Sequence, residues 1–189
     1  MTTATEPETG MAGAAPLIPP VASLWLMPAP ADAAWLSRLV GELAARHAAP
    51  LFVPHLTVAG DVPAPPESLT EELAAVARAA APFETPIAAI DTGEAFFRSF
   101  YARFARAAPL DALKRAAVAA GLGGSLDDFM PHVSLLYGQP PPAAKAASAA
   151  QAARALVGRP VRFDRLALTT SGNDAPVADW RIVAERPLG

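Results

Sequence analysis

Two short motifs hold the side chains of this 189-residue chain that are best suited to acid–base chemistry. PHLTV, residues 54–58, contains His55 and Thr57, and PHVSL, residues 131–135, contains His132 and Ser134. Both run proline, histidine, aliphatic residue, hydroxyl residue, aliphatic residue. The chain has three histidines, so the repeated pattern accounts for two of them.

The residue pattern of both motifs predicts β-strands. Alternate side chains of a strand share a face, so His55 should point the same way as Thr57, and His132 the same way as Ser134. The aliphatic residues between them should enter a core. If the two strands face each other, two imidazoles and two hydroxyls meet in one small volume.

This set is sufficient to hydrolyse a phosphodiester without a metal ion. A neutral imidazole activates water as a general base, and a protonated one gives a proton to the departing oxygen. Histidine suits both roles because its unperturbed pKa is about 6.5. The hydroxyls would hold the nonbridging phosphate oxygens or orient the water.

The alternative is structural. A single histidine in an apolar strand is more often a hydrogen-bonded core residue than a catalyst, but the repetition favours catalysis. His47, at the end of a predicted helix, meets the helix dipole favourably and is assigned no chemistry. No carboxylate flanks either motif and no metal-ligand spacing is present, so we expect no metal and no other cofactor.

The composition narrows the class of protein. With 52% hydrophobic and 17% charged residues the chain should fold, and its net charge of −3 gives no general attraction to polyanions. The absence of cysteine excludes disulfides and thiolate catalysis. Prolines interrupt the apolar N-terminal stretch, which suits neither a signal peptide nor a membrane span. We therefore expect a flexible tail at residues 1–19, no membrane association and a cytoplasmic location.

The elements that must position the motifs occur twice in the same order. Hydrophobic periodicity predicts helices at 32–47, 109–120 and 142–157, with a further helix starting near residue 70. It predicts strands at 21–27, 52–59, 83–89, 96–104, 130–137, 161–170 and 180–185. A change of alternation near Asp164 predicts a bulge or bend. Residues 20–189 should therefore form one bilobal α+β domain, with two antiparallel-sheet lobes, outer helices, an approximate two-fold axis and a central groove.

The motifs and their flanks resemble the two-histidine (2H) phosphoesterase superfamily, and within it the plant- and yeast-type cyclic nucleotide phosphodiesterases. The segments that carry this resemblance are VASLWLMP, LFVPHLTVAG, DTGEAFFRSFY, FMPHVSLLYG and RFDRLALTTSGN followed by Trp180. They cover most of residues 21–185. The resemblance implies a bilobal fold with the active site between the lobes.

The resemblance also implies a reaction. Family substrates are ADP-ribose 1″,2″-cyclic phosphate, which gives the 1″-phosphate, and nucleoside 2′,3′-cyclic phosphates, which give 2′-phosphates. When the family's site is transferred to this chain motif by motif, His55 and Thr57 form one half of the site. His132 and Ser134 form the other half. By analogy His132 with Ser134 activates water and His55 is the general acid. The near-symmetry of the motifs leaves the reverse assignment open.

Four further residues are candidates for contacts with the substrate. Tyr137 would reach the site if its strand ends before Gly138, or else pack on the rim. Trp25 matches a family aromatic residue that could stack on a base or ribose, or it is a plain core residue. Phe97 and Arg98, in the strand expected at 96–104, could line the groove and offset phosphate charge, although a solvated arginine is the simpler interpretation.

The favoured partner is a small cyclic phosphate nucleotide bound by a monomer. An enzyme that acts on RNA ends, either a 2′,5′ ligase-like protein or an exonuclease, is a second candidate, but it should show a basic track for several phosphates. Fifteen lysines and arginines against 18 acidic residues, without a cluster, argue against such a track. A non-catalytic nucleotide-binding protein of the same fold is the third candidate.

Overall fold

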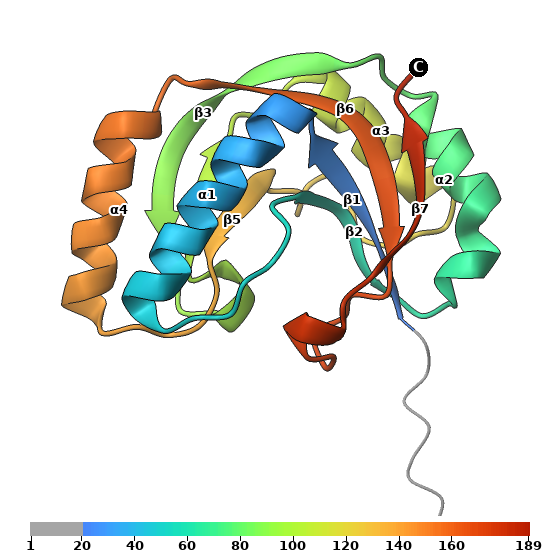
Figure 1. Cartoon of the computed structure of the whole chain (residues 1–189). Coiled ribbons are helices and arrows are strands. Elements are labelled where there is room, and N and C mark those ends of the chain that lie inside the picture. Colours follow the sequence, from blue (N-terminus) through green and yellow to red (C-terminus); the bar gives the residue numbers. More distant parts are fainter. Residues whose placement is uncertain (1–20) are drawn as a thin grey trace, which may run out of the picture.

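The computed structural model describes residues 21–189, and the tail expected at residues 1–19 lies outside the described residues (Figure 1). The strands are β1 (Ala22–Pro28), β2 (Leu56–Val62), β3 (Phe83–Thr92), β4 (Phe100–Phe104), β5 (His132–Leu136), β6 (Pro160–Thr169) and β7 (Ile182–Pro187). The helices are α1 (Pro30–His47), α2 (Thr70–Ala77), α3 (Ala108–Ala119) and α4 (Pro142–Leu156). Three 3-10 turns are η1 (Pro66–Leu69), η2 (Phe96–Arg98) and η3 (Val177–Asp179).

All strands belong to one antiparallel sheet in the order β1-β2-β5-β4-β3-β6-β7, and β1 also pairs with β6, so the sheet closes on itself. One half is β2-β1-β6-β7 and the other is β5-β4-β3. Helices α1 and α4 pack on the second half, and α2 and α3 on the first (Figure 1). The predicted α+β fold with two antiparallel-sheet lobes and outer helices is confirmed.

The lobes do not coincide with the two repeats of the sequence. β3 and β4, from the first repeat, join β5 of the second, while β6 and β7 join β1 and β2 of the first. Each lobe therefore contains one motif strand. The two motif strands meet at the seam between the lobes, where Leu56 pairs with Val133.

The bend predicted near Asp164 is confirmed. Phe163 pairs with Pro28 and Arg165 with Met27, so Asp164 is the extra residue of a bulge. On its other edge β6 pairs with β3 before the bulge and with β7 after it. The bulge thus lets one strand serve both halves of the sheet.

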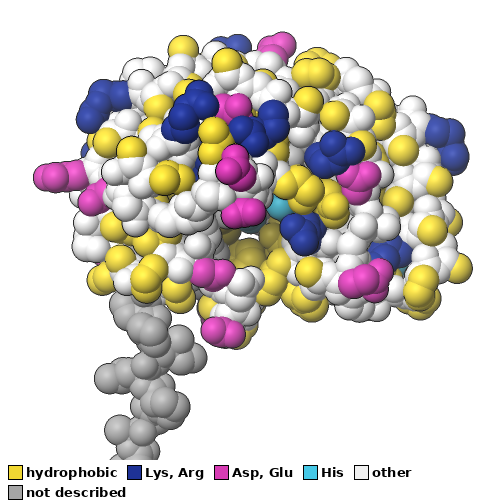
Figure 2. Space-filling view, turned by 180° about the vertical axis from the view of Figure 1, so that it is seen from behind, with side chains coloured by type: hydrophobic (Ala, Val, Ile, Leu, Met, Phe, Trp, Pro, Cys, Tyr) yellow, Lys and Arg dark blue, Asp and Glu magenta, His cyan; other side chains and the backbone are white. Residues whose placement is uncertain are grey.

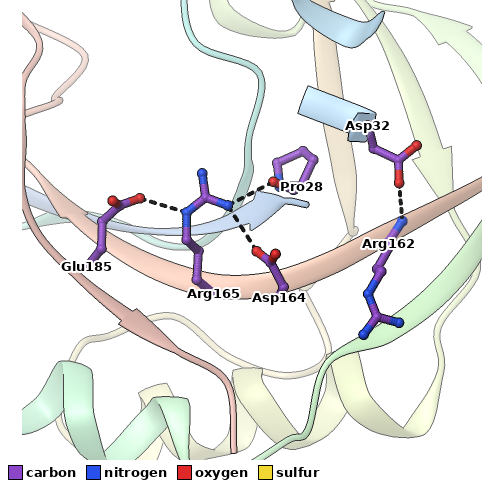
Figure 3. Close-up of polar contacts among 6 residues, drawn as sticks. All are labelled: Pro28, Asp32, Arg162, Asp164, Arg165 and Glu185. Carbon is purple, nitrogen blue, oxygen red and sulfur yellow. Dashed lines mark hydrogen bonds and ion pairs between the residues drawn. The ribbon is translucent and has the colours of Figure 1, made fainter. Parts of the chain in front are cut away.

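Arg165 holds this bend in place (Figure 3). Its guanidinium donates to the carbonyl oxygen of Pro28 at 3.1 Å, to Asp164 Oδ1 at 2.9 Å and to Glu185 Oε1 at 2.8 Å. Nearby, the backbone N–H of Arg162 donates to Asp32 in the first turn of α1. These bonds link β1, β6, β7 and α1.

The core confirms the alternation expected in the motif strands, with Leu56, Val58, Val133 and Leu135 at most 2% exposed. β1 is buried along its whole length. Its even-numbered residues face the main core, whereas Trp25 and Met27 form a second apolar cluster with Ala167, against which Trp180 packs. None of the helices in residues 21–189 is long and apolar enough to cross a membrane.

Two predicted strands, β2 and β4, begin four residues later than expected. β2 starts at Leu56, not at residue 52, because Pro54 lacks the N–H that a strand ladder needs. Phe97 and Arg98 lie in η2, so the prediction of a strand there was wrong. Gly93 allows this turn to fold back, because a Cβ at Gly93 would lie 2.6 Å from the Arg98 carbonyl oxygen.

Candidate active site

A cavity of about 380 Å³ lies where the two motif strands meet. All eight residues that the sequence singled out line it: His55, Thr57, His132, Ser134, Tyr137, Trp25, Phe97 and Arg98. Figure 2 shows the molecule hollowed on one face, with a histidine visible inside the hollow. Residues from both lobes are therefore brought together, as the repeated motif predicted.

Both histidines are held by a hydrogen bond to the backbone carbonyl oxygen two residues earlier. Nδ1 of His55 lies 2.6 Å from the carbonyl oxygen of Val53, and Nδ1 of His132 lies 2.9 Å from that of Met130. A carbonyl oxygen accepts, so Nδ1 carries the hydrogen in both rings. Nε2 of each neutral ring then has a free lone pair, as proton transfer to or from a ligand requires.

Burial keeps both imidazoles neutral in the ligand-free protein. It lowers the pKa of His55 from 6.5 to about 3, against the opposing effect of the Val53 hydrogen bond, and the neighbouring His132 lowers it further. Burial also lowers the pKa of His132, the bond to Met130 opposes this, and the charge of Arg98 adds to it. An anion bound between the rings would reverse these shifts, because it favours the charged form.

Trp25 contacts His55 and leaves little surface for a substrate. The two rings are stacked with centroids 3.5 Å apart and planes 6° apart, and Trp25 is 3% exposed. The aromatic surface that remains around the cavity comes from Trp180, Phe97 and Phe96. Trp180 is stacked on Phe97 at 5.5 Å and lies edge-on to Trp25 at 5.8 Å.

Ser134 and Tyr137 lie on the β5 side of the cavity. Ser134 Oγ donates to the carbonyl oxygen of Phe97 at 2.9 Å, which ties β5 to η2. β5 ends at Leu136, so Tyr137 turns into the cavity, where it is stacked on Phe52 at 3.8 Å. Burial raises the pKa of Tyr137 well above 10, so its phenol stays a neutral donor.

Thr57 and Arg98 are the more exposed members of the set. Arg98 supplies the one lysine or arginine side chain among the described residues of the cavity wall, and within residues 21–189 no carboxylate pairs with it. Its charge is thus available to a bound anion. No group of three or more His, Asp or Glu side chains in residues 21–189 is arranged to hold a metal ion.

The sequence reasoning did not assign the residues of one wall. Ser171, Gly172, Asn173 and Trp180 line the cavity from the segment between β6 and β7, together with Asp61. The backbone N–H of Asn173 donates to Asp61 Oδ1 at 3.0 Å, and its side-chain amide donates to Asp61 Oδ2. The signal was present, since the resemblance included TTSGN and Trp180, but nothing in the local pattern turned this loop toward the motifs.

Several solved structures share this fold. TT0787 of Thermus thermophilus matches with a TM-score of 0.57 and 18% identity, over 89% of this chain and 97% of that chain. Escherichia coli LigT matches with a TM-score of 0.54 in its complex with phosphate, at 15% identity over 90% and 98% of the two chains. Its complex with 3′-AMP gives 0.52, at 15% identity over 90% and 99%. No curated protein sequence matches this chain.

The sequence profile of the 2′-5′ RNA ligase superfamily matches residues 28–175, which include both histidine motifs and most of the cavity wall. The match extends over well over half of the chain and agrees with the fold of the solved structures. The chain belongs to the 2′-5′ RNA ligase superfamily, whose members are 2H phosphoesterases.

Proposed function

We propose that the protein is a metal-independent cyclic phosphodiesterase that uses His55 and His132 as its acid–base pair. The observation that carries this proposal is the convergence of two imidazoles in one cavity, each with Nδ1 tied to a backbone carbonyl. A binding protein has no need of two such rings with free Nε2 atoms. General acid–base catalysis requires them.

The proposed reaction uses one ring as the base and the other as the acid. With a nucleoside 2′,3′-cyclic phosphate, His132 takes a proton from a water molecule whose oxygen attacks phosphorus. The P–O3′ bond breaks, and O3′ takes a proton from His55, which leaves a 2′-phosphate. Arg98 and Thr57 line the cavity, and in this proposal they hold the nonbridging oxygens, where positive charge and hydrogen-bond donors favour the transition state.

The size and charge of the cavity favour a small substrate. Its volume of about 380 Å³ is at the lower end for ligand pockets, and its lining offers one cation, Arg98, for one phosphate group. Trp180 and Phe97 provide aromatic faces of the kind on which a base can stack. LigT, with a similar fold, binds 3′-AMP and phosphate. ADP-ribose 1″,2″-cyclic phosphate is the second substrate to test, since its reacting group is the same.

The name of the superfamily favours a second candidate, an enzyme that acts on RNA ends. Such an enzyme holds several phosphates at once, which needs several lysines or arginines along a track. The described cavity wall has one positively charged side chain, Arg98, and one carboxylate, Asp61. The charge of the wall therefore favours the small substrate, and a cytoplasmic monomer remains our expectation.

The test is hydrolysis of 2′,3′-cyclic AMP and of ADP-ribose 1″,2″-cyclic phosphate in excess EDTA, with the product position read by phosphorus NMR. His55→Ala and His132→Ala should each lower kcat at least ~100-fold, the usual contribution of a general acid or base. His47→Ala is the matched control, because His47 bonds Ser148 on α4, away from the cavity, and should keep full activity. Failure of the folded wild type on both substrates, with turnover of RNA ends, would favour the second candidate.

A further inference from the structure

The two histidines repeat in sequence, but their surroundings differ. His55 is stacked on Trp25 with ring centroids 3.5 Å apart and planes 6° apart. His132 has no such partner among residues 21–189. Tyr101 lies edge-on to it, at 5.1 Å and 65°. The site is therefore asymmetric where the motifs are not.

Two contacts together determine the orientation of the His55 ring. The face of Trp25 sets the plane of the imidazole, and the Val53 carbonyl sets its rotation within that plane. Trp25 is itself held firmly, because β1 pairs with β2 at Thr57 on one side and with β6 at Ala167 on the other. These two contacts therefore fix the direction in which Nε2 of His55 points.

The same contact affects the charge of the ring. The face of an indole attracts a cation, and the attraction is strongest when the pair is desolvated. His55 is 7% exposed and Trp25 is 3% exposed, so an imidazolium at this position would lie against a dry aromatic face. At His132 the charge of Arg98 acts in the opposite direction and disfavours the imidazolium.

Burial acts against this attraction, because it is the largest cause that lowers the pKa of His55. Tyr137 stays a neutral phenol, and the carboxylate of Asp61 accepts both hydrogen bonds from Asn173. His132 and Arg98 are the remaining groups of the described wall, and both favour the neutral form of the ring that they face.

We propose that Trp25 is a positioning residue that fixes the plane of His55 and offsets part of the cost of charging its buried imidazole, so that His55 can act as the general acid in the substrate complex. This inference rests on the proposed function and makes it more specific. It names Trp25 as the side chain that supports the proposed acid role of His55.

The test is an NMR titration of the histidine rings with saturating sulfate, a dianion whose charge is constant from pH 4 to pH 8. Trp25→Leu should lower the pKa of His55 in this complex by about one unit, the size expected for a lost buried cation–π contact. It should lower kcat roughly tenfold. Trp25→Phe restores an aromatic face and should recover most of both effects.

A role in packing alone predicts the opposite sign. Leucine is smaller than tryptophan, so water would enter and the pKa of His55 would rise. A rise, no change, or an equal shift at His132 would overturn the inference. Trp180→Leu is the matched control, because Trp180 lies edge-on to His55 at 6.5 Å; it should raise KM and leave the His55 titration unaltered. Failure of the proposed function would appear separately, as a wild type without turnover, since the titration does not require turnover.

Discussion

At the scale of single residues, the two histidines and the tyrosine of the site are neutral in the ligand-free protein. Both imidazoles lose their proton more easily than free histidine because they are buried, and the phenol of Tyr137 keeps its own for the same reason. The ligand-free cavity therefore has one charged group free for an anion among its described residues, Arg98. The proton needed for catalysis has to be taken up in the presence of the substrate's own negative charge.

This property predicts the pH dependence of kcat/KM. The active form holds one proton on the histidine pair, whichever ring carries it. Because the pKa values of both rings lie below 6.5, most of the free enzyme has lost that proton at pH 7. We expect kcat/KM for 2′,3′-cyclic AMP to fall up to about tenfold per pH unit above pH 6.5. Its optimum should lie below pH 6.5, and a flat profile between pH 6 and pH 8 would contradict this account.

At the scale of elements, the reasoning from sequence succeeded where a pattern is local. The alternation of Leu56 with Val58 and of Val133 with Leu135 located both motif strands, and the phase change at Asp164 located the bulge in β6. It failed at η2, where aromatic residues with high strand propensity form a turn. That turn depends on the approach of Gly93 to the Arg98 carbonyl and on bonds to residues far along the chain, which no local window contains.

Lys145 illustrates such a long-range bond. It is 5% exposed in α4, and Nζ donates to the carbonyl oxygen of Gly93 at 2.8 Å and to Gln139 Oε1 at 3.5 Å. It thereby ties α4 to the two segments that present Phe97, Arg98 and Tyr137.

We predict that Lys145→Met raises KM several-fold with a smaller change in kcat, because it loosens the substrate-binding turn and leaves the histidines in place. The lost charge-assisted bond should cost roughly 2 kcal/mol of unfolding free energy. Steady-state kinetics and urea unfolding measure the two effects. A fall in kcat as large as that of His132→Ala, at unchanged KM, would show that the turn acts on the chemistry directly.

At the scale of the whole molecule, the buried histidines lower the free energy of unfolding at low pH. A buried imidazole that resists protonation binds fewer protons in the folded chain than in the unfolded one. Stability is then greatest above pH 6.5 and declines as the pH falls toward the folded-state pKa. His55, with its pKa of about 3, is the strongest case.

We therefore expect the unfolding free energy of the wild type to fall by about 3 kcal/mol between pH 6.5 and pH 4 through His55 alone, at about 1.4 kcal/mol per unit. Carboxylates add their own dependence, so the comparison is with His55→Gln, which should show a shallower decline. Parallel curves for wild type and His55→Gln from urea unfolding would rule out this origin.

The closure of the sheet through β1 and β6 also has a consequence for synthesis. Thr169 hydrogen-bonds to Ser23, 146 positions earlier, so β1 finds this partner only after residue 169 has been translated. Until then β1, apolar and buried along its whole length in the finished protein, leaves the ribosome with one edge unpaired. Nascent chains stopped before β6 should therefore depend on chaperones to stay free of aggregates.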